Sequence, residues 1–180
     1  MKLIHLSAFS VLLIGLLSCG SSNEEKSATD KDWKTLSENN YSIHYPENWE
    51  LDQSKKNGMS FMILSPAESE NDKVRENVNL LIQDIPDGMS MDQYIQVSES
   101  QIKNVIPNST ILKSARQLSD EFEYHKISYT GNEGQTNYKF EQDIFVKKGK
   151  AYILTLTCEQ NQFDKYQEVG EKILNSFRLE

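Results

Sequence analysis

Apolar and polar residues alternate in several short segments of the chain, which is the pattern of half-buried β-strands. The clearest example is Tyr41 to Tyr45, in which large apolar residues alternate with polar ones until Pro46. Pro46 to Trp49 reads as a tight turn that directs Trp49 into a core. Further strands are predicted at residues 59–64, 78–85, 109–118, 122–130, 136–147 and 150–158.

Two segments instead show the spacing of amphipathic helices. The first begins at Ser90, where Ser90 and Gln93 have the form of a capping box, and it ends before Pro107. The second is expected at residues 162–175, where Gly170 favours close packing on a sheet. The expected inward faces are Met91, Tyr94, Ile95, Ser98, Ile102 and Val105 in the first helix, and Phe163, Tyr166, Val169, Gly170, Ile173 and Leu174 in the second.

The order of these elements predicts an α+β fold, an antiparallel β-sheet covered by helices in an α/β/α sandwich. Asn132 to Gly134 and Lys148-Gly149 supply hairpin turns between the later strands. Strands and helices do not alternate as parallel βαβ units would require. Residues 33–180 are therefore expected to form one domain, with residues 176–179 as a short final strand or cap.

The N-terminus has the composition of an export segment. Met1-Lys2 is a short positive region, residues 3–17 are apolar, and Leu16-Leu17-Ser18-Cys19 follows. The apolar run is shorter than the roughly 20 residues that a membrane span needs. The motif resembles the lipobox of bacterial lipoproteins. The resemblance implies that residues 1–18 are a signal peptide, that cleavage precedes Cys19, and that Cys19 carries a lipid that anchors the chain to a membrane.

Residues 19–32 lack aromatic and β-branched aliphatic side chains, so a flexible acidic tether is predicted. Removal of residues 1–18 takes away Lys2 and no acid, which changes the net charge from −8 to −9. Such a chain is poorly suited to nucleic acid or anionic headgroups. Gly20, rather than Asp, follows the cysteine, which in a Gram-negative host would imply the outer membrane or the cell surface.

The domain resembles the superfamily that includes the photosystem II extrinsic protein PsbP, a eukaryotic Ran-binding protein and many bacterial lipoproteins. The resemblance rests on residues 41–49, on residues 151–157, and on Phe163, Tyr166 and residues 173–177, and it spans about Trp33 to Leu179. These are core and turn residues, so the resemblance implies a PsbP-like fold. Members bind proteins or support the assembly of complexes, and no shared catalytic constellation is carried over.

Few residues are candidates for chemistry. The sequence has no phosphate-binding loop, nucleophile elbow, HExxH or CxxC motif. His44 and His125 remain after processing, and both are expected to be exposed or structural. Cys158 shares a strand face with Leu154 and Leu156, so a buried thiol is expected rather than a reactive one.

The remaining candidates are an acidic loop and two tryptophans. Glu68, Glu70 and Asp72 alternate with polar residues but lack the glycine and the distal glutamate of a calcium loop, so a solvated loop is expected. Trp49 is expected to anchor the core. Trp33, beside the tether, is the one candidate for an interaction surface.

These observations favour a membrane-anchored, non-catalytic module without cofactor or metal that binds another envelope protein. The alternatives are a small-ligand or metal carrier, or an envelope hydrolase, that uses a pocket between sheet and helix. A mainly structural, stress-related lipoprotein is a third possibility. A concave pocket with convergent polar groups would favour the carrier or the hydrolase.

Overall fold

The computed structural model describes residues 32–70, 72, 74–118 and 122–180. The predicted signal peptide, Cys19 and the tether up to residue 31 lie outside the described residues. The strands are β1 (Trp33–Glu38), β2 (Tyr41–Pro46), β3 (Glu50–Asp52), β4 (Met59–Leu64), β5 (Asn77–Asp84), β6 (Thr110–Leu118), β7 (Glu123–Glu133), β8 (Thr136–Lys147), β9 (Lys150–Glu159) and β10 (Arg178–Leu179), and the helices are α1 (Met91–Val105) and α2 (Phe163–Asn175). The predicted α+β class is confirmed.

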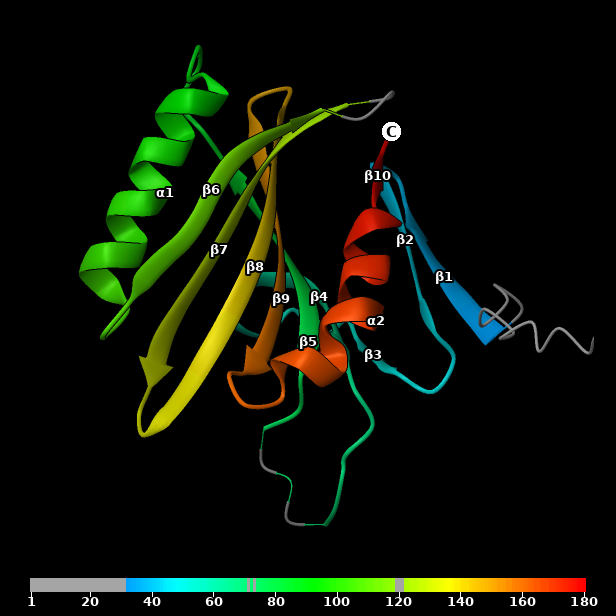
Figure 1. Ribbon diagram of the computed structural model, residues 1–180. Helices are drawn as coiled ribbons and strands as arrows, with labels where there is room; N and C mark the ends of the chain where they lie inside the picture. Colours follow the sequence, from blue (N-terminus) through cyan, green and yellow to red (C-terminus); the bar gives the residue numbers. More distant parts are fainter. Residues whose placement is uncertain (1–31, 71, 73, 119–121) are drawn as a thin grey trace, which may run out of the picture.

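Seven strands form the main antiparallel sheet, in the order β3-β4-β5-β9-β8-β7-β6. Consecutive hairpins join β6 through β9, and β5 pairs with β9, so the segment with α1 crosses from one part of the sheet to the other. A second sheet, in the order β1-β2-β10, was not predicted. Figure 1 shows α1 and α2 on opposite sides of the main sheet, with β1, β2 and β10 beyond α2.

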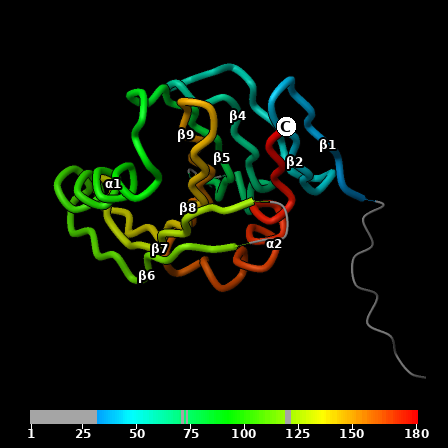
Figure 2. Tube along the Cα trace, turned by 90° about the horizontal axis from the view of Figure 1, so that it is seen from above, coloured from blue at the N-terminus to red at the C-terminus, as the bar shows by residue number. Residues whose placement is uncertain are grey.

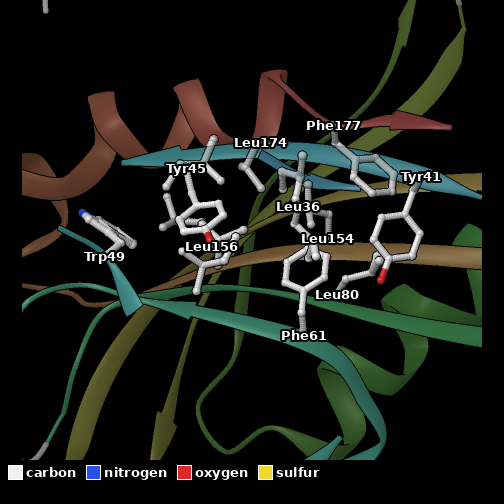
Figure 3. Close-up of a cluster of buried hydrophobic side chains, with 14 of the residues drawn as sticks. Leu36, Tyr41, Tyr45, Trp49, Phe61, Leu80, Leu154, Leu156, Leu174 and Phe177 are labelled. Atoms are coloured by element: carbon white, nitrogen blue, oxygen red, sulfur yellow. The ribbon is translucent and has the colours of Figure 1, made fainter. Parts of the chain in front are cut away.

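The larger core lies between the main sheet, α2 and the small sheet. Alternate residues of β4, β5 and β9 point into it, including the fully buried Phe61, Leu80 and Leu154. Figure 3 shows these side chains meeting Leu36 and Tyr45 from the small sheet. Gly170 lets α2 approach β9, because a Cβ at this position would lie 2.5 Å from Leu156 Cδ2. The predicted close packing at Gly170 is therefore confirmed.

The smaller core lies under α1 on the opposite face. Ile95 and Ile102 of α1 pack there with Ile127, Ile144 and Ile153 from β7, β8 and β9. The Ser90 hydroxyl accepts a hydrogen bond from Gln93 N, and the Gln93 side chain accepts one from Ser90 N, which confirms the capping box.

The predicted inward stripe of α1 is wrong at one position. Val105 has helical spacing with Ile102 and Ser98, yet it is 74% exposed. It occupies the last position of α1, and Gly131 of β7 is covered instead by Ile106, which follows it. Helical periodicity identifies the apolar face of a helix but not how far the sheet beneath it extends.

Candidate functional site

A cleft of about 990 Å³ separates the β2–β3 turn and the start of β1 from α2. Both tryptophans of the chain line it, together with Pro46 and Val169. The other lining residues are mostly charged: Asp32, Glu47, Asn48, Lys165, Glu168 and Lys172. The cleft therefore combines an apolar set of side chains with charges of both signs.

The β2–β3 turn forms one wall. Pro46 ends β2, and Trp49 N donates a hydrogen bond to Pro46 O over 3.0 Å, which closes the predicted turn. The turn directs Trp49 inward, where it is 5% exposed and meets the Tyr166 ring edge-on with centroids 6.2 Å apart. Trp49 lies at one end of the core cluster in Figure 3. The prediction that Trp49 anchors the core is confirmed.

Trp33 forms the opposite part of this wall. It is the first residue of β1 and is paired in register with Pro46. Its side chain is half-buried, and Lys172 Nζ lies 4.7 Å from its ring centroid. A backbone hydrogen bond of 2.8 Å from Glu47 N to Asp32 O fixes the chain just before Trp33. The indole is thus held in place while part of it remains accessible.

One face of α2 forms the other wall. Lys165, Glu168 and Lys172 lie three or four residues apart on one face of the helix, and Val169 lies at its border with the buried face, where it also packs against the larger core. Lys165 Nζ and the Tyr166 hydroxyl both donate hydrogen bonds to Glu68 Oε1. These two bonds, from Lys165 first, lower the pKa of Glu68.

The remaining predicted candidates do not come together as a site. Glu68 joins α2, whereas both carboxylate oxygens of Asp72 accept backbone N–H groups within its own loop, and Glu70 is exposed. His44 is exposed, as expected. Cys158 is fully buried, and burial raises the pKa of its thiol to about 12. A protonated, enclosed thiol is a poor nucleophile, which confirms the structural interpretation.

His125 has neighbours that the sequence did not reveal. Its Nε2 lies 2.8 Å from Ser114 Oγ, and the Ser114 hydroxyl donates a 2.6 Å hydrogen bond to Glu99 Oε1. Because the Ser114 hydroxyl donates its hydrogen bond to Glu99, His125 must donate from Nε2, and its enclosed Nδ1 has no hydrogen-bond partner among the described residues. Burial lowers the pKa of His125. The network joins α1, β6 and β7, and no described carboxylate accepts a hydrogen bond from Nδ1 of His125, as the aspartate of a catalytic triad would.

A second polar cluster is buried on the α2 face of the sheet. Lys126 Nζ of β7 lies 3.1 Å from Asp143 Oδ1 and 3.9 Å from Glu141 Oε2, both on β8. Burial raises the pKa of Asp143 to about 6 despite Lys126, and Glu171 of α2 adds to the increase. Burial lowers the pKa of Lys126, but the Asp143 carboxylate outweighs it and the net change is upward. The Lys126 ammonium group thus lies between the two carboxylates and partly neutralises them.

In residues 32–180, apart from those at 71, 73 and 119–121, no three His, Cys, Asp or Glu side chains are arranged to hold a metal ion. Neither α1 nor α2 is long and apolar enough to cross a membrane.

Solved structures share the fold at low sequence identity. Cyanobacterial PsbP (CyanoP) from Synechocystis sp. PCC 6803 has a TM-score of 0.62 and 16% identity, over 83% of this chain and 93% of that one. LpqN of Mycobacterium tuberculosis, described as involved in cell envelope biogenesis, has a TM-score of 0.60 and 11% identity, over 82% and 90%. The Saccharomyces cerevisiae Ran-binding protein Mog1p has a TM-score of 0.52 and 6% identity, over 82% of this chain and 95% of that one.

At the level of sequence, no curated protein matches the chain significantly. The model of the PsbP family matches residues 32–179, which include all described strands and both helices. The predicted PsbP-like fold is thereby confirmed, and the chain belongs to the PsbP family.

Proposed function

We propose that the protein is a membrane-anchored, non-catalytic module that binds another envelope protein through the Trp33–Trp49 cleft. The observation that carries this proposal is the composition of the cleft, in which two tryptophans, Pro46 and Val169 are bordered by charged residues. Protein interfaces have the same organisation, with an apolar aromatic centre and a polar rim. The occupant is an extended segment of the partner that places an apolar, aromatic or proline side chain on Trp33.

The charges around the cleft favour a protein over the other classes of partner. Asp32, Glu47 and Glu168 offset Lys165 and Lys172, so the rim has no cationic excess for nucleic acid or anionic lipid. In this proposal the membrane contact comes from lipid on Cys19. Fully extended, the chain from Cys19 to Asp32 spans at most ~45 Å, so the cleft stays near the membrane. The role in cell envelope biogenesis given for LpqN is consistent with such a location.

Trp33→Ala is expected to lower the yield of the bound partner about 30-fold, because a central tryptophan contributes roughly 2 kcal/mol or more at an interface. The measurement is crosslinking of the full-length protein in cells, with mass spectrometry of the product and quantification of the dominant envelope protein. Trp33→Phe keeps an aromatic face and should retain an intermediate yield. Thermal unfolding of both variants checks that the protein still folds after the half-buried indole has been replaced.

A Cys19→Ser variant separates anchoring from binding. It should move the protein from the membrane to the soluble fraction, whereas Trp33→Ala should leave it in the membrane. The proposal fails if no envelope protein is captured in repeated trials, or if Trp33→Ala captures as much as the unmodified protein.

The Ser114–His125 pair is the one observation that favours the alternative of an envelope hydrolase, since a serine within hydrogen-bond reach of a histidine can be an activated nucleophile. We expect no reaction of Ser114 with a fluorophosphonate probe, because its hydroxyl donates a hydrogen bond to Glu99 rather than to His125, and the Nδ1 atom of His125 has no orienting partner among the described residues. Mass spectrometry of the treated protein tests this. Labelling that disappears in both Ser114→Ala and His125→Ala would instead favour acyl-transfer chemistry.

A further inference from the structure

β6 forms one edge of the main sheet and pairs only with β7. Figure 2 shows it on the outside of the sheet, with α1 beside it and α2 farther away. No described strand pairs with its outer edge, so part of its backbone N–H and C=O groups point away from the sheet. Such an edge can accept a further strand.

Exposed hydrophobic side chains gather on the same side of the molecule. Among the described residues, the large hydrophobic side chains that are exposed are Val97 and Val105 of α1 and Leu112 and Leu118 of β6. Leu118 is 81% exposed and Leu112 54%. They all lie on two adjacent elements rather than being scattered, as single exposed apolar residues usually are.

The two faces of β6 differ in character. Ser114, opposite the buried Ile127, faces α1, and Leu118 lies on the same face by the alternation of the strand. Lys113 lies opposite Ser128 on the α2 face, and it is exposed. Arg116, on the α1 face, is already held by Asp92 and Glu123. A strand laid along this edge would therefore meet an apolar side chain on one face and a lysine on the other.

The properties of β6 argue against a second copy of this chain as the strand that pairs with its outer edge. Lys113 is exposed and β6 has no acidic residue to pair with it, so two antiparallel β6 edges would bring two lysines into one interface. The irregularity in pairing between Ile111 and Lys113 is a β-bulge, which hinders regular edge-to-edge pairing. The net charge of −8 adds repulsion between copies. Because Arg116 is already paired, the complementarity of this edge comes from the exposed Lys113, which suits an acidic side chain on an added strand.

We propose that the outer edge of β6 binds an extended segment of a partner protein in which acidic and apolar residues alternate. The segment adds an eighth strand to the seven-stranded main sheet, with its apolar side chains beside Leu118 and its acidic ones beside Lys113. This surface is separate from the Trp33–Trp49 cleft, and the two can engage the same partner or different ones.

The test places the photocrosslinking residue p-benzoylphenylalanine at Leu112, Lys113, Gln117 or Leu118 of the full-length protein in cells. Lys56, exposed in the connection between β3 and β4, and Lys148, exposed in the turn between β8 and β9, serve as control positions. The crosslinked residue of the partner is located by mass spectrometry. Successive β6 positions are expected to crosslink to successive positions of one segment, and that segment should alternate acidic and apolar residues.

A charge reversal sharpens the result. Lys113→Glu should reduce the crosslink from position 118 about fivefold, because an attractive exposed charge pair becomes a repulsive one. Lys56→Glu, an equivalent change elsewhere on the surface, should leave it unchanged. Crosslinks to β6 of a second copy, crosslinks without a common register, or no crosslinks above those of the control positions would each overturn the proposal. Trp33→Ala changes the cleft but not β6, so it should leave these crosslinks in place. The proposal for β6 can therefore hold even where the proposal for the cleft fails.

Discussion

Lys126→Met is expected to lower the free energy of unfolding by about 3–5 kcal/mol at about pH 8, because it leaves two buried carboxylates without their cation. Asp143 and Glu141 have side chains only 2% and 10% exposed. Asp143 Oδ1 and Glu141 Oε2 have no hydrogen bond that would replace the ion pair. Chemical denaturation followed by tryptophan fluorescence measures the loss.

The deficit of Lys126→Met should shrink as the pH falls. The pKa of Asp143 is raised to about 6, above its ordinary value of 3.8. A carboxyl group with a raised pKa in the folded state binds its proton more tightly there. Its contribution to stability is therefore fully present below about pH 4 and is lost as the pH rises through about 6. Without Lys126 that pKa should rise further, so the variant should approach the unmodified protein near pH 5.

Two controls make this result specific. Lys113→Met removes an exposed lysine from the neighbouring strand and should change stability by less than about 0.5 kcal/mol. The double variant Lys126→Met/Asp143→Leu replaces the pair with apolar side chains and should recover much of the loss. Equal losses in Lys126→Met and Lys113→Met would show that the buried cluster does not stabilise the fold.

Gly170→Val is expected to destabilise the protein by about 3 kcal/mol through overpacking. The new Cβ would lie 2.5 Å from Leu156 Cδ2 and 2.7 Å from its Cδ1. Leu156 is fully buried and cannot turn toward solvent, so either its side chain is strained or α2 moves away from β9. Gly170→Ala should cost less, because the helix preference for alanine offsets about 1 kcal/mol of the strain.

Glu168→Val is the matched control, since it places the same β-branched residue at an exposed position of α2 and should cost well under 1 kcal/mol. In the double variant Gly170→Val/Leu156→Ala the smaller side chain makes room for valine. Its loss should therefore be smaller than the sum of the two single losses. Additive losses would contradict the steric explanation. Denaturant unfolding of the unmodified protein, the single variants Gly170→Val and Leu156→Ala, and the double variant provides this comparison.

The sequence predicted the elements whose side chains alternate or repeat strongly. β4 and β8 begin and end at the predicted residues, and the Ser90 capping box located the start of α1. β1 was missed because Leu36 is its one buried side chain, so the strand has little apolar alternation of its own. It is a strand because of its pairing with β2. The second sheet depends on this pairing and on that of β10, which local sequence does not encode.

The candidate site was predictable only in part. Composition drew attention to Trp33 and Trp49, but nothing local indicated that Lys172 would cover Trp33 or that α2 would form the second wall of the cleft. The neighbours of His125 were missed for a similar reason. Ser114 reaches it across the β6–β7 pair, and Glu99 comes from α1, so the network depends on strand register and helix placement together.

The pairing of β1 has a mechanical consequence. Tension applied along the chain at Asp32 would act first on the hydrogen bond from Glu47 N to Asp32 O and then on the Trp33–Pro46 pair at the end of β1. β1 pairs with β2 and with no other described strand, so a pull directed away from β2 would break its hydrogen bonds one after another. The first residue to leave would be Trp33, and a ligand seated on its ring would resist that movement. Under the proposed function, tension on the chain before Asp32 and binding of a partner at Trp33 would therefore oppose each other.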